Sequence, residues 1–361
     1  DEKNKDYKYS YNYQNWYPSA EFETKNARSN VGLFELSPFS KFDLKGEKVH
    51  EELQILCTAN IPNEPGKIKY TQMLNSDGGI ETDLTVICIE KNYFRIVSSA
   101  ANREHDKFHI LKHISKDVKL TDVTEDYCCL GLFGPKSREM ISSISSDDFS
   151  NENFKFATAK FVKINDVEVW AQRISYVGEL GFELYVKKEN ALKLFDILIN
   201  KGKTYKISLC GMHAMDIMRM ESGYLHWGHD ISPEENQFEA GLNFAVSFKK
   251  NINFIGRAAL EKKRDKKDHK KFKMLILNHS KEGAPLLLHD EPIYLKDKIV
   301  GRTTSGCYSF NYNKNLAFGY INSGLTSDQI DKEAFEIEVE KKKYPASVIT
   351  RPLNDKKLSS L

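Results

Sequence analysis

The sequence has no apolar run that approaches the about 18 residues of a membrane span, and no secretory hydrophobic region opens it. It also has almost no excess charge of one sign, because 53 basic residues are balanced by 51 acidic ones. Global electrostatics therefore gives no argument for nucleic-acid binding. We expect neither a membrane nor a nucleic acid as a partner.

Cysteine is scarce and carries no CxxC pair or dense spacing, which favours free thiols in a reducing compartment. The adjacent pair Cys128-Cys129 is typical of a buried apolar strand and less so of a redox device. The sequence also contains no P-loop, GxGxxG, GxSxG or HExxH motif. The sequence therefore lacks the motifs that indicate nucleotide binding, flavin binding or a common hydrolase mechanism. We also expect no metal site. The six cysteines are Cys57, Cys88, Cys128, Cys129, Cys210 and Cys307.

At 361 residues, the chain is long enough for two or three domains on a prior of about 150 residues each. Strand and helix patterns mix without a βαβ rhythm, so we predict an α+β fold with antiparallel sheets. The clearest boundary is the basic block at 262–273, which is either a solvated linker or helix end, or a contact for a polyanion. The residues after it are rich in short strand patterns, which predict a small C-terminal barrel.

One strand contains a residue that strands disfavour. The stretch LNSDGGIETDLTV, residues 74–86, begins with turn chemistry at Asp77-Gly78-Gly79 and continues as an alternating strand. The alternation puts Glu81, Asp83 and Thr85 on the face opposite the apolar side chains. Because Asp is depleted in strands, Asp83 is a candidate functional residue.

A second candidate pair comes from RISYVGELGFELYV, residues 173–186. A four-residue hairpin loop at 178–181 would set Tyr176 opposite Glu183, with their Cβ atoms about 5 Å apart. A phenol beside a carboxylate suits a flat heterocycle with adjacent N–H donors. An ordinary cross-strand pair on a wet sheet face accounts for the same spacing.

Other candidates rest on weaker patterns. His226 and His229 have a spacing that a helix turns into a metal pair, but a surface or hydrogen-bonded pair is the simpler interpretation. Asp216, Arg219 and Glu221 lie in an apolar helix, where a buried structural network is the simplest account.

Taken in order, several long motifs resemble one family closely. They are VGLFELSPFSKFDLKG, YTQMLNSDGGIETDLTV, RISYVGELGFELYV, MRMESGYLHWGHDISPEENQFEAGL and RPLNDKK. They look like the folate-binding C-terminal half of dimethylglycine oxidase, dimethylglycine dehydrogenase and sarcosine dehydrogenase, which shares its fold with the glycine-cleavage aminomethyltransferase, or T-protein. The resemblance implies a three-domain cloverleaf. Its expected parts are residues 1–60 with 146–250, residues 61–145, and a barrel at 251–361.

The resemblance also implies roles for individual residues. Asp83 falls on the catalytic carboxylate beside the reactive folate nitrogens, Tyr176 falls near the same centre, and Glu183 falls on the acid that holds the pterin. The remaining expected contacts to the cofactor, tetrahydrofolate, come from Phe39, Phe156, Tyr70 and Val97.

Departures from the family refine the expectation. Met215 replaces an Arg of the T-protein pattern, which favours the dehydrogenase type and leaves Lys342 and Lys343 as candidates for the glutamate tail. The flavin half of those enzymes is absent, so we expect no flavin site in this chain and a flavin domain either upstream of Asp1 or on a separate subunit.

The implied activity is formation of 5,10-methylenetetrahydrofolate from the methyl-derived carbon of an N-methylated amine such as dimethylglycine or sarcosine. A stand-alone aminomethyl or methyl transferase and a non-catalytic folate-binding scaffold are the alternatives. The expected location is cytoplasmic, or the mitochondrial matrix in a eukaryote.

Overall fold

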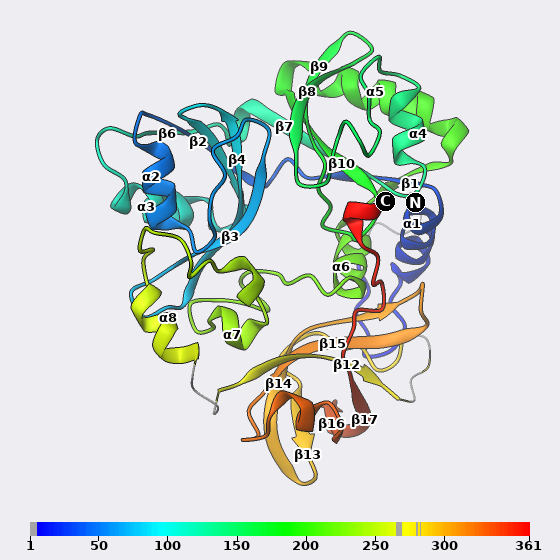
Figure 1. Cartoon of the computed structure of the whole chain (residues 1–361). Helices are drawn as coiled ribbons and strands as arrows, with labels where there is room; N and C mark the ends of the chain where they lie inside the picture. Colours follow the sequence, from blue (N-terminus) through cyan, green and yellow to red (C-terminus); the bar gives the residue numbers. More distant parts are fainter. Residues whose placement is uncertain (1–5, 265–268, 279–280, 282) are drawn as a thin grey trace.

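The computed structural model describes residues 6–264, 269–278, 281 and 283–361. Three sheets organise the chain, and each forms the centre of one lobe in Figure 1. None of the helices in the described part has the length and apolar character needed to cross a bilayer. The α+β class with a closed C-terminal barrel is confirmed.

The first sheet has six strands in the order β11-β1-β7-β10-β9-β8. All its pairings are antiparallel except β1 with β11, which run parallel. Helices α4 and α5 cover its outer face, and α1 and α6 pack together beside β1 and β11. The elements are α1 Tyr17–Ser29, β1 Val31–Glu35, β7 Tyr127–Phe133, α4 Ser137–Ser142, β8 Ala159–Ile164, β9 Val167–Gln172, β10 Gly181–Lys187, α5 Ala191–Gly202, β11 Ile207–Cys210 and α6 Met212–Glu221.

The second sheet has five antiparallel strands in the order β3-β4-β5-β2-β6. Helices α2 and α3 cover one of its faces, where Val49, Leu53 and Ile110 pack on strand residues such as Leu84 and Phe94. The elements are β2 Ser40–Lys45, α2 Val49–Leu56, β3 Ile68–Leu74, β4 Ile80–Glu90, β5 Tyr93–Ser98, α3 Arg103–His113 and β6 Lys119–Asp122.

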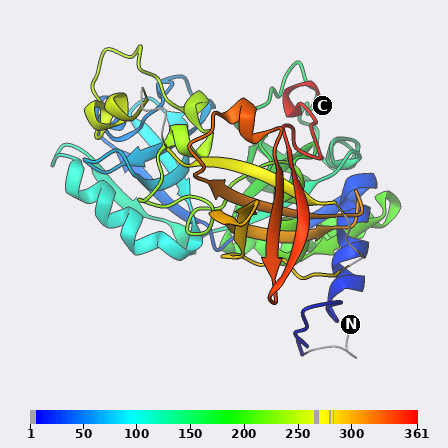
Figure 2. The same cartoon turned by 90° about the horizontal axis from the view of Figure 1, so that it is seen from below.

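The third sheet closes into a six-stranded barrel, shown in orange and red in the foreground of Figure 2. Short helices α7 and α8 lead toward it. The basic block at 262–273 contributes the end of α8 and the start of β12, while residues 265–268 lie outside the described part. The elements are α7 Gln237–Ala240, α8 Arg257–Arg264, β12 Lys271–Leu277, β13 Pro292–Leu295, β14 Lys298–Ser309, β15 Lys314–Ile321, α9 Ser327–Ile330, β16 Ala334–Val339 and β17 Lys342–Ile349.

Strand pairing crosses the expected domain boundaries at two places. Strand β2, expected in the first domain, pairs with β5 and β6 of the second sheet. Strand β7, expected in the second domain, pairs with β1 and β10 of the first sheet. The division of the chain into domains stays a proposal, with residues 40–45 placed by pairing in the second unit and residues 127–133 in the first.

Two buried carboxylates on or near α6 fasten the barrel to the first lobe. Asp230 accepts hydrogen bonds from Arg219 Nη1 at 2.6 Å and from Ser305 Oγ at 2.8 Å. Glu221 accepts from Arg28 Nη2 of α1 and from Ser309 Oγ of β14, both at 2.7 Å. The buried network expected for Arg219 and Glu221 is therefore confirmed.

Replacement of Arg219 by Ala is expected to destabilise the protein by about 3–5 kcal/mol, because the buried Asp230 loses its charged partner. The matched control is Arg302→Ala, which breaks an exposed pair with Asp290 and is expected to cost about 1 kcal/mol or less. Urea unfolding followed by circular dichroism measures both. Equal midpoint shifts would show that the buried network does not fasten the barrel.

Candidate functional site

Strand β4 carries Asp83 on the face that the sequence predicts. Burial alternates along the strand, with Ile80, Thr82 and Leu84 buried and the residues between them partly exposed. Gln72 of β3 lies opposite Asp83, and its Nε2 donates a hydrogen bond to Asp83 Oδ1 at 2.9 Å. Tyr70 shares this face two residues before Gln72. The sheet therefore presents a carboxylate flanked by an amide and a phenol.

Burial dominates the electrostatics of this carboxylate. Desolvation raises the pKa of Asp83 to about 6, although the hydrogen bonds from Gln72 and Tyr70 act in the opposite direction. The ring of Tyr70 stacks on Phe244 at a centroid distance of 6.1 Å, which adds an aromatic wall. A carboxyl with a pKa near neutrality can exchange a proton during a reaction at physiological pH.

The second carboxylate, Glu183, lies on the inner face of the first sheet. Tyr185 stands two residues further along β10 and donates its hydroxyl hydrogen to Glu183 Oε2 at 2.8 Å. Burial raises the pKa of Glu183 to about 7, against the lowering effect of this hydrogen bond. Glu183 is thus a desolvated carboxylate, which favours a ligand with N–H donors.

A buried amide stands beside Glu183. Gln172, at the end of β9, is the register partner of Glu183 and has no exposed surface. Neither of its amide atoms has a hydrogen-bond partner within the described residues. An unpaired buried amide costs free energy, about 1–3 kcal/mol for each group. The position suits a ligand that supplies both a donor and an acceptor next to Glu183.

The predicted pairing of Tyr176 with Glu183 is wrong. Residues 173–180 form a loop, and Glu183 faces Gln172 across the ladder. The loop carbonyls bond to other segments, since Arg28 Nη1 donates to Val177 O at 2.7 Å and Asn354 Nδ2 donates to Gly178 O at 2.8 Å. Because these carbonyls accept hydrogen bonds from Arg28 and Asn354, they are not available for pairing with β10.

Tyr176 nevertheless remains at the junction of the two sheets. Its hydroxyl donates to Leu225 O at 2.8 Å, and its ring stacks on Tyr224 at 6.1 Å. It packs in one apolar cluster with Phe39, Val97 and Met215. Burial raises the pKa of Tyr176, and the negative charge of Asp83 contributes to the shift. The structure therefore brings Asp83, Tyr70, Tyr176, Phe39 and Val97 together.

Phe156 lies at the edge of this junction and is 37% exposed. The next residue, Ala157, bridges the two sheets, because its N–H donates to Arg173 O and its carbonyl accepts from Ile68 N–H, both at 3.0 Å. Phe156 therefore stands next to the point where the backbone joins the two sheets.

The remaining candidates lie elsewhere. Lys342 and Lys343 belong to barrel strand β17, where the Lys343 ammonium sits 3.8 Å from the ring centroid of Tyr294. His226 and His229 lie in a turn, with ring centroids 4.7 Å apart.

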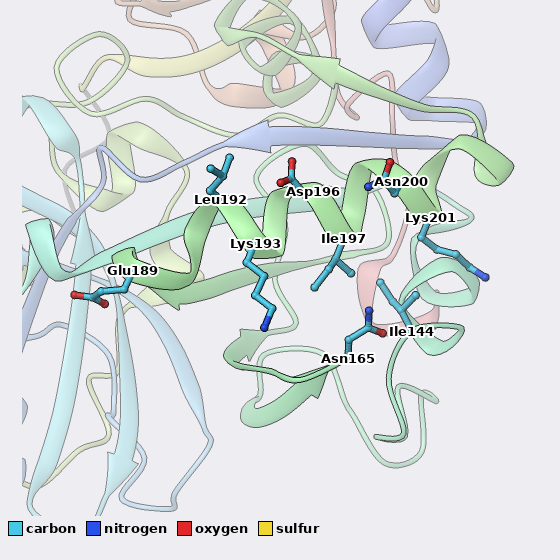
Figure 3. Close-up of a pocket in the computed structure, with 9 residues that line it drawn as sticks. All are labelled: Ile144, Asn165, Glu189, Leu192, Lys193, Asp196, Ile197, Asn200 and Lys201. Carbon is cyan, nitrogen blue, oxygen red and sulfur yellow. The ribbon is translucent and has the colours of Figure 1, made fainter.

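A separate pocket of about 710 Å³ runs along α5. Figure 3 shows its lining, which includes Asn165, Leu192 and Lys193. Because α5 covers the outer face of the first sheet, this pocket is on the opposite side from Glu183. It takes no part in the candidate site.

Three polar residues of the site escaped the sequence analysis: Gln72, Gln172 and Tyr185. Tyr185 carried a signal, because strand alternation puts it on the same face as Glu183. Gln172 depends on the register of β9 with β10, which the hairpin prediction at 178–181 placed incorrectly. Gln72 depends on the register of β3 with β4, which the sequence analysis did not predict.

Comparison with known families gives this geometry a context. Residues 3–250 match the GCVT N-terminal domain, and residues 270–355 match the glycine cleavage T-protein C-terminal barrel domain. The chain belongs to the glycine cleavage T-protein family. Members of this family bind tetrahydrofolate and transfer one-carbon groups.

Two relatives match nearly the whole chain. The 4-methylaminobutanoate oxidase (formaldehyde-forming) of Paenarthrobacter nicotinovorans is 35% identical over 97% of this chain and 42% of its own length. Mitochondrial dimethylglycine dehydrogenase of Rattus norvegicus is 32% identical over 96% of this chain and 40% of its own. The chain therefore spans about two fifths of the length of these relatives.

A solved structure confirms the fold. The glycine cleavage system aminomethyltransferase T from Bartonella henselae superposes with a TM-score of 0.83 at 20% identity. The match covers 97% of this chain and 94% of that one.

The Glu183→Gln variant is expected to be more stable than the wild type at pH 8. In the folded protein the pKa of Glu183 is about 7, which lies above the ordinary value of 4.5. The wild type therefore loses stability as the pH rises from about 4.5 to about 7, where Glu183 ionises at a cost in the folded state. The gain is at most about 3 kcal/mol and fades toward pH 5.

Urea unfolding at both pH values measures this effect. The matched control is Glu168→Gln at an exposed position of the neighbouring strand β9, which should change little. If Glu183→Gln and Glu168→Gln behave alike at pH 8, Glu183 is not desolvated.

Proposed function

We propose that this chain performs the folate-dependent step of an N-demethylation, in which a formaldehyde-level carbon from an N-methylated amine becomes 5,10-methylenetetrahydrofolate. The observation that carries the proposal is the pair of desolvated carboxylates, Asp83 and Glu183, on the inner faces of two adjoining sheets. One is suited to exchange a proton and the other to hold a heterocycle.

Glu183 and Gln172 fit the pterin ring of tetrahydrofolate. A pterin presents two adjacent N–H donors, which a carboxylate binds through two parallel hydrogen bonds. The unpaired amide of Gln172 can then serve the neighbouring donor or acceptor of the ring. Tyr185 fixes the Glu183 carboxylate, so the ring would be held in one orientation.

Asp83 supplies the proton chemistry. Bound tetrahydrofolate would bring two nucleophilic nitrogens. With formaldehyde, the carbonyl oxygen would leave as water and take up one proton, and ring closure by the second nitrogen would release one proton. Asp83 can accept this proton, and its negative charge stabilises the cationic iminium before closure. Gln72 and Tyr70 hold the carboxylate, while Phe39, Val97 and Tyr176 provide apolar walls that keep the reactants together and exclude water.

The names of two relatives support an N-methylated amine as the source of the carbon. One relative is named as a formaldehyde-forming amine oxidase and another as a dimethylglycine dehydrogenase, and each is more than twice the length of this chain. We infer that amine oxidation takes place on a flavin domain outside this chain. A stand-alone aminomethyl transferase is the alternative, and it would show turnover with an aminomethyl donor and no flavoprotein.

Binding and turnover respond differently to the two carboxylates. Glu183→Ala should abolish tetrahydrofolate binding measured by calorimetry. Asp83→Asn should leave the Kd within about threefold and lower the enzymatic rate of methylenetetrahydrofolate formation from formaldehyde by about 100-fold or more. Rates are corrected for the uncatalysed reaction, and Asp77→Asn in the exposed turn before β4 is the control.

A protein that binds tetrahydrofolate and is indifferent to Asp83→Asn is a folate-binding scaffold, which contradicts the proposed catalysis. A wild type that binds no tetrahydrofolate contradicts the pocket assignment itself.

Binding should also depend on pH. The pterin N–H pair requires an ionised Glu183, whose pKa of about 7 means that acid pH protonates it. As the pH rises toward 7, the Kd for tetrahydrofolate should fall by close to tenfold per pH unit. Above about pH 7.5 it should become constant. Asp83→Asn should keep this profile. A Kd that is flat from pH 6 to 8 would contradict the role of Glu183.

A further inference from the structure

A second group of titratable side chains lies at the edge of strand β4, next to Asp83. Pairing between β4 and β5 ends at Leu84 and Ser98. Residues 80–83 of β4 therefore extend past β5, and the first turn of α3 lies against this free edge through the contacts of His105 and Asp106 with Glu81 and Thr82.

His105 connects both faces of the strand. Its Nε2 lies 3.0 Å from Glu81 Oε2, and its Nδ1 lies 3.1 Å from Asp106 Oδ1. Glu81 shares the face of Asp83, two positions earlier in the strand, whereas Asp106 accepts a hydrogen bond from Thr82 on the other face at 3.0 Å. The imidazole is thus held at both nitrogens beside the catalytic carboxylate.

Exposure changes sharply along this group. The side chain of Asp106 is 2% exposed, that of Glu81 is 17% exposed, and that of His105 is 44% exposed. The other oxygen of Asp106, Oδ2, has no hydrogen-bond partner within the described residues. Of these three side chains, that of His105 is therefore the one most open to water.

Two further aromatic side chains border His105. Trp227 contributes a wall, with its ring centroid 5.9 Å from that of His105. His109 follows one turn later on α3, but burial lowers its pKa to about 4, so it stays neutral near pH 7. Asn75 Nδ2 donates to Glu81 Oε1 at 3.0 Å and fixes the second carboxylate oxygen. The groups that face His105 are therefore Glu81, Asp106, His109 and Trp227.

We propose that His105, oriented by Asp106 and linked through Glu81, carries the proton of Asp83 out to solvent after the folate ring closes. The idea rests on the proposed function, because it concerns the proton released in that reaction. With formaldehyde, one proton is taken up as the oxygen of the carbon donor leaves as water, and one proton is released when the second folate nitrogen closes the ring. The released proton would pass to Asp83 and then through water to Glu81 and His105, and it would reach the bulk water or buffer that supplies the proton for the departing oxygen. Asp83 regains its charge, and no oxidant or reductant is needed.

The folded structure gives a reason for such a route. Bound folate would cover the face that carries Asp83 and block direct exchange with water. A protonated Asp83 cannot accept the proton of the next turnover, so its deprotonation must keep pace with the reaction. Asp106 resembles the carboxylate that orients an imidazole in acid–base catalysis.

A simpler alternative is that the His105 ion pairs only anchor α3 to the strand edge. The two ideas differ in their response to small proton carriers. An anchoring residue would affect stability and folate affinity, and free imidazole would not replace it. A proton carrier would affect the rate, and imidazole in the buffer would compensate.

The test uses the full chain with tetrahydrofolate and formaldehyde. We expect His105→Gln to lower kcat by about tenfold or more, with the Kd for tetrahydrofolate within about twofold. In His105→Ala, added imidazole should restore at least half of the wild-type rate. Glu81→Gln should lower kcat in the same direction, and His113→Gln, two turns further along α3, should leave it unchanged.

Each outcome separates the possibilities. Retained kcat in both His105→Gln and Glu81→Gln would overturn the relay. So would a loss of kcat in His105→Ala that tracks a fall in melting temperature and does not respond to imidazole. If the wild-type protein shows no turnover above the uncatalysed rate, the proposed function itself is contradicted. The wild-type measurement therefore separates this case from a failure of the proton relay alone.

Discussion

The candidate site depends on the desolvation of two carboxylic acids, Asp83 and Glu183. Asp83 and Glu183 both have pKa values raised by burial, so each disfavours its own charged form in the free protein. Such a state persists only if the rest of the fold is stable enough to hold it. The two sheets supply that rigidity, because β3 pairs with β4 at Asp83 while β7 and β9 flank Glu183.

The architecture places the two acids on the inner faces of two adjoining sheets. Each sheet buries its outer face under its own helices, and the inner faces share one apolar cluster that includes Tyr185 and Val97. The barrel contributes through Asp230 and Glu221, whose hydrogen bonds reach from α1 and α6 to β14. The loop at 173–180 is held by the same network, which places Tyr176 near Asp83.

The sequence predicted some of this and missed the rest for physical reasons. Asp83 could be identified from the sequence because the alternation of apolar and polar side chains along β4, and the low strand propensity of Asp, are both visible within a few residues. The pairing of Tyr176 with Glu183 failed because Arg28 and Asn354, distant in sequence, capture the loop carbonyls. Gln172 was missed because cross-strand register is set by the whole sheet. His105 gave no signal, since its partners Glu81 and Asp106 meet only at a strand edge that folding creates.

The most direct measurement is the titration of Glu183 by NMR, with carbon-13 in its side-chain carboxyl. We expect a pKa of about 7 for Glu183 in the free protein. With tetrahydrofolate bound, the N–H pair should favour the carboxylate and lower the pKa of Glu183 well below that value. A free-protein pKa near the ordinary 4.5, unchanged by tetrahydrofolate, would contradict the claim that desolvation of this acid defines the site.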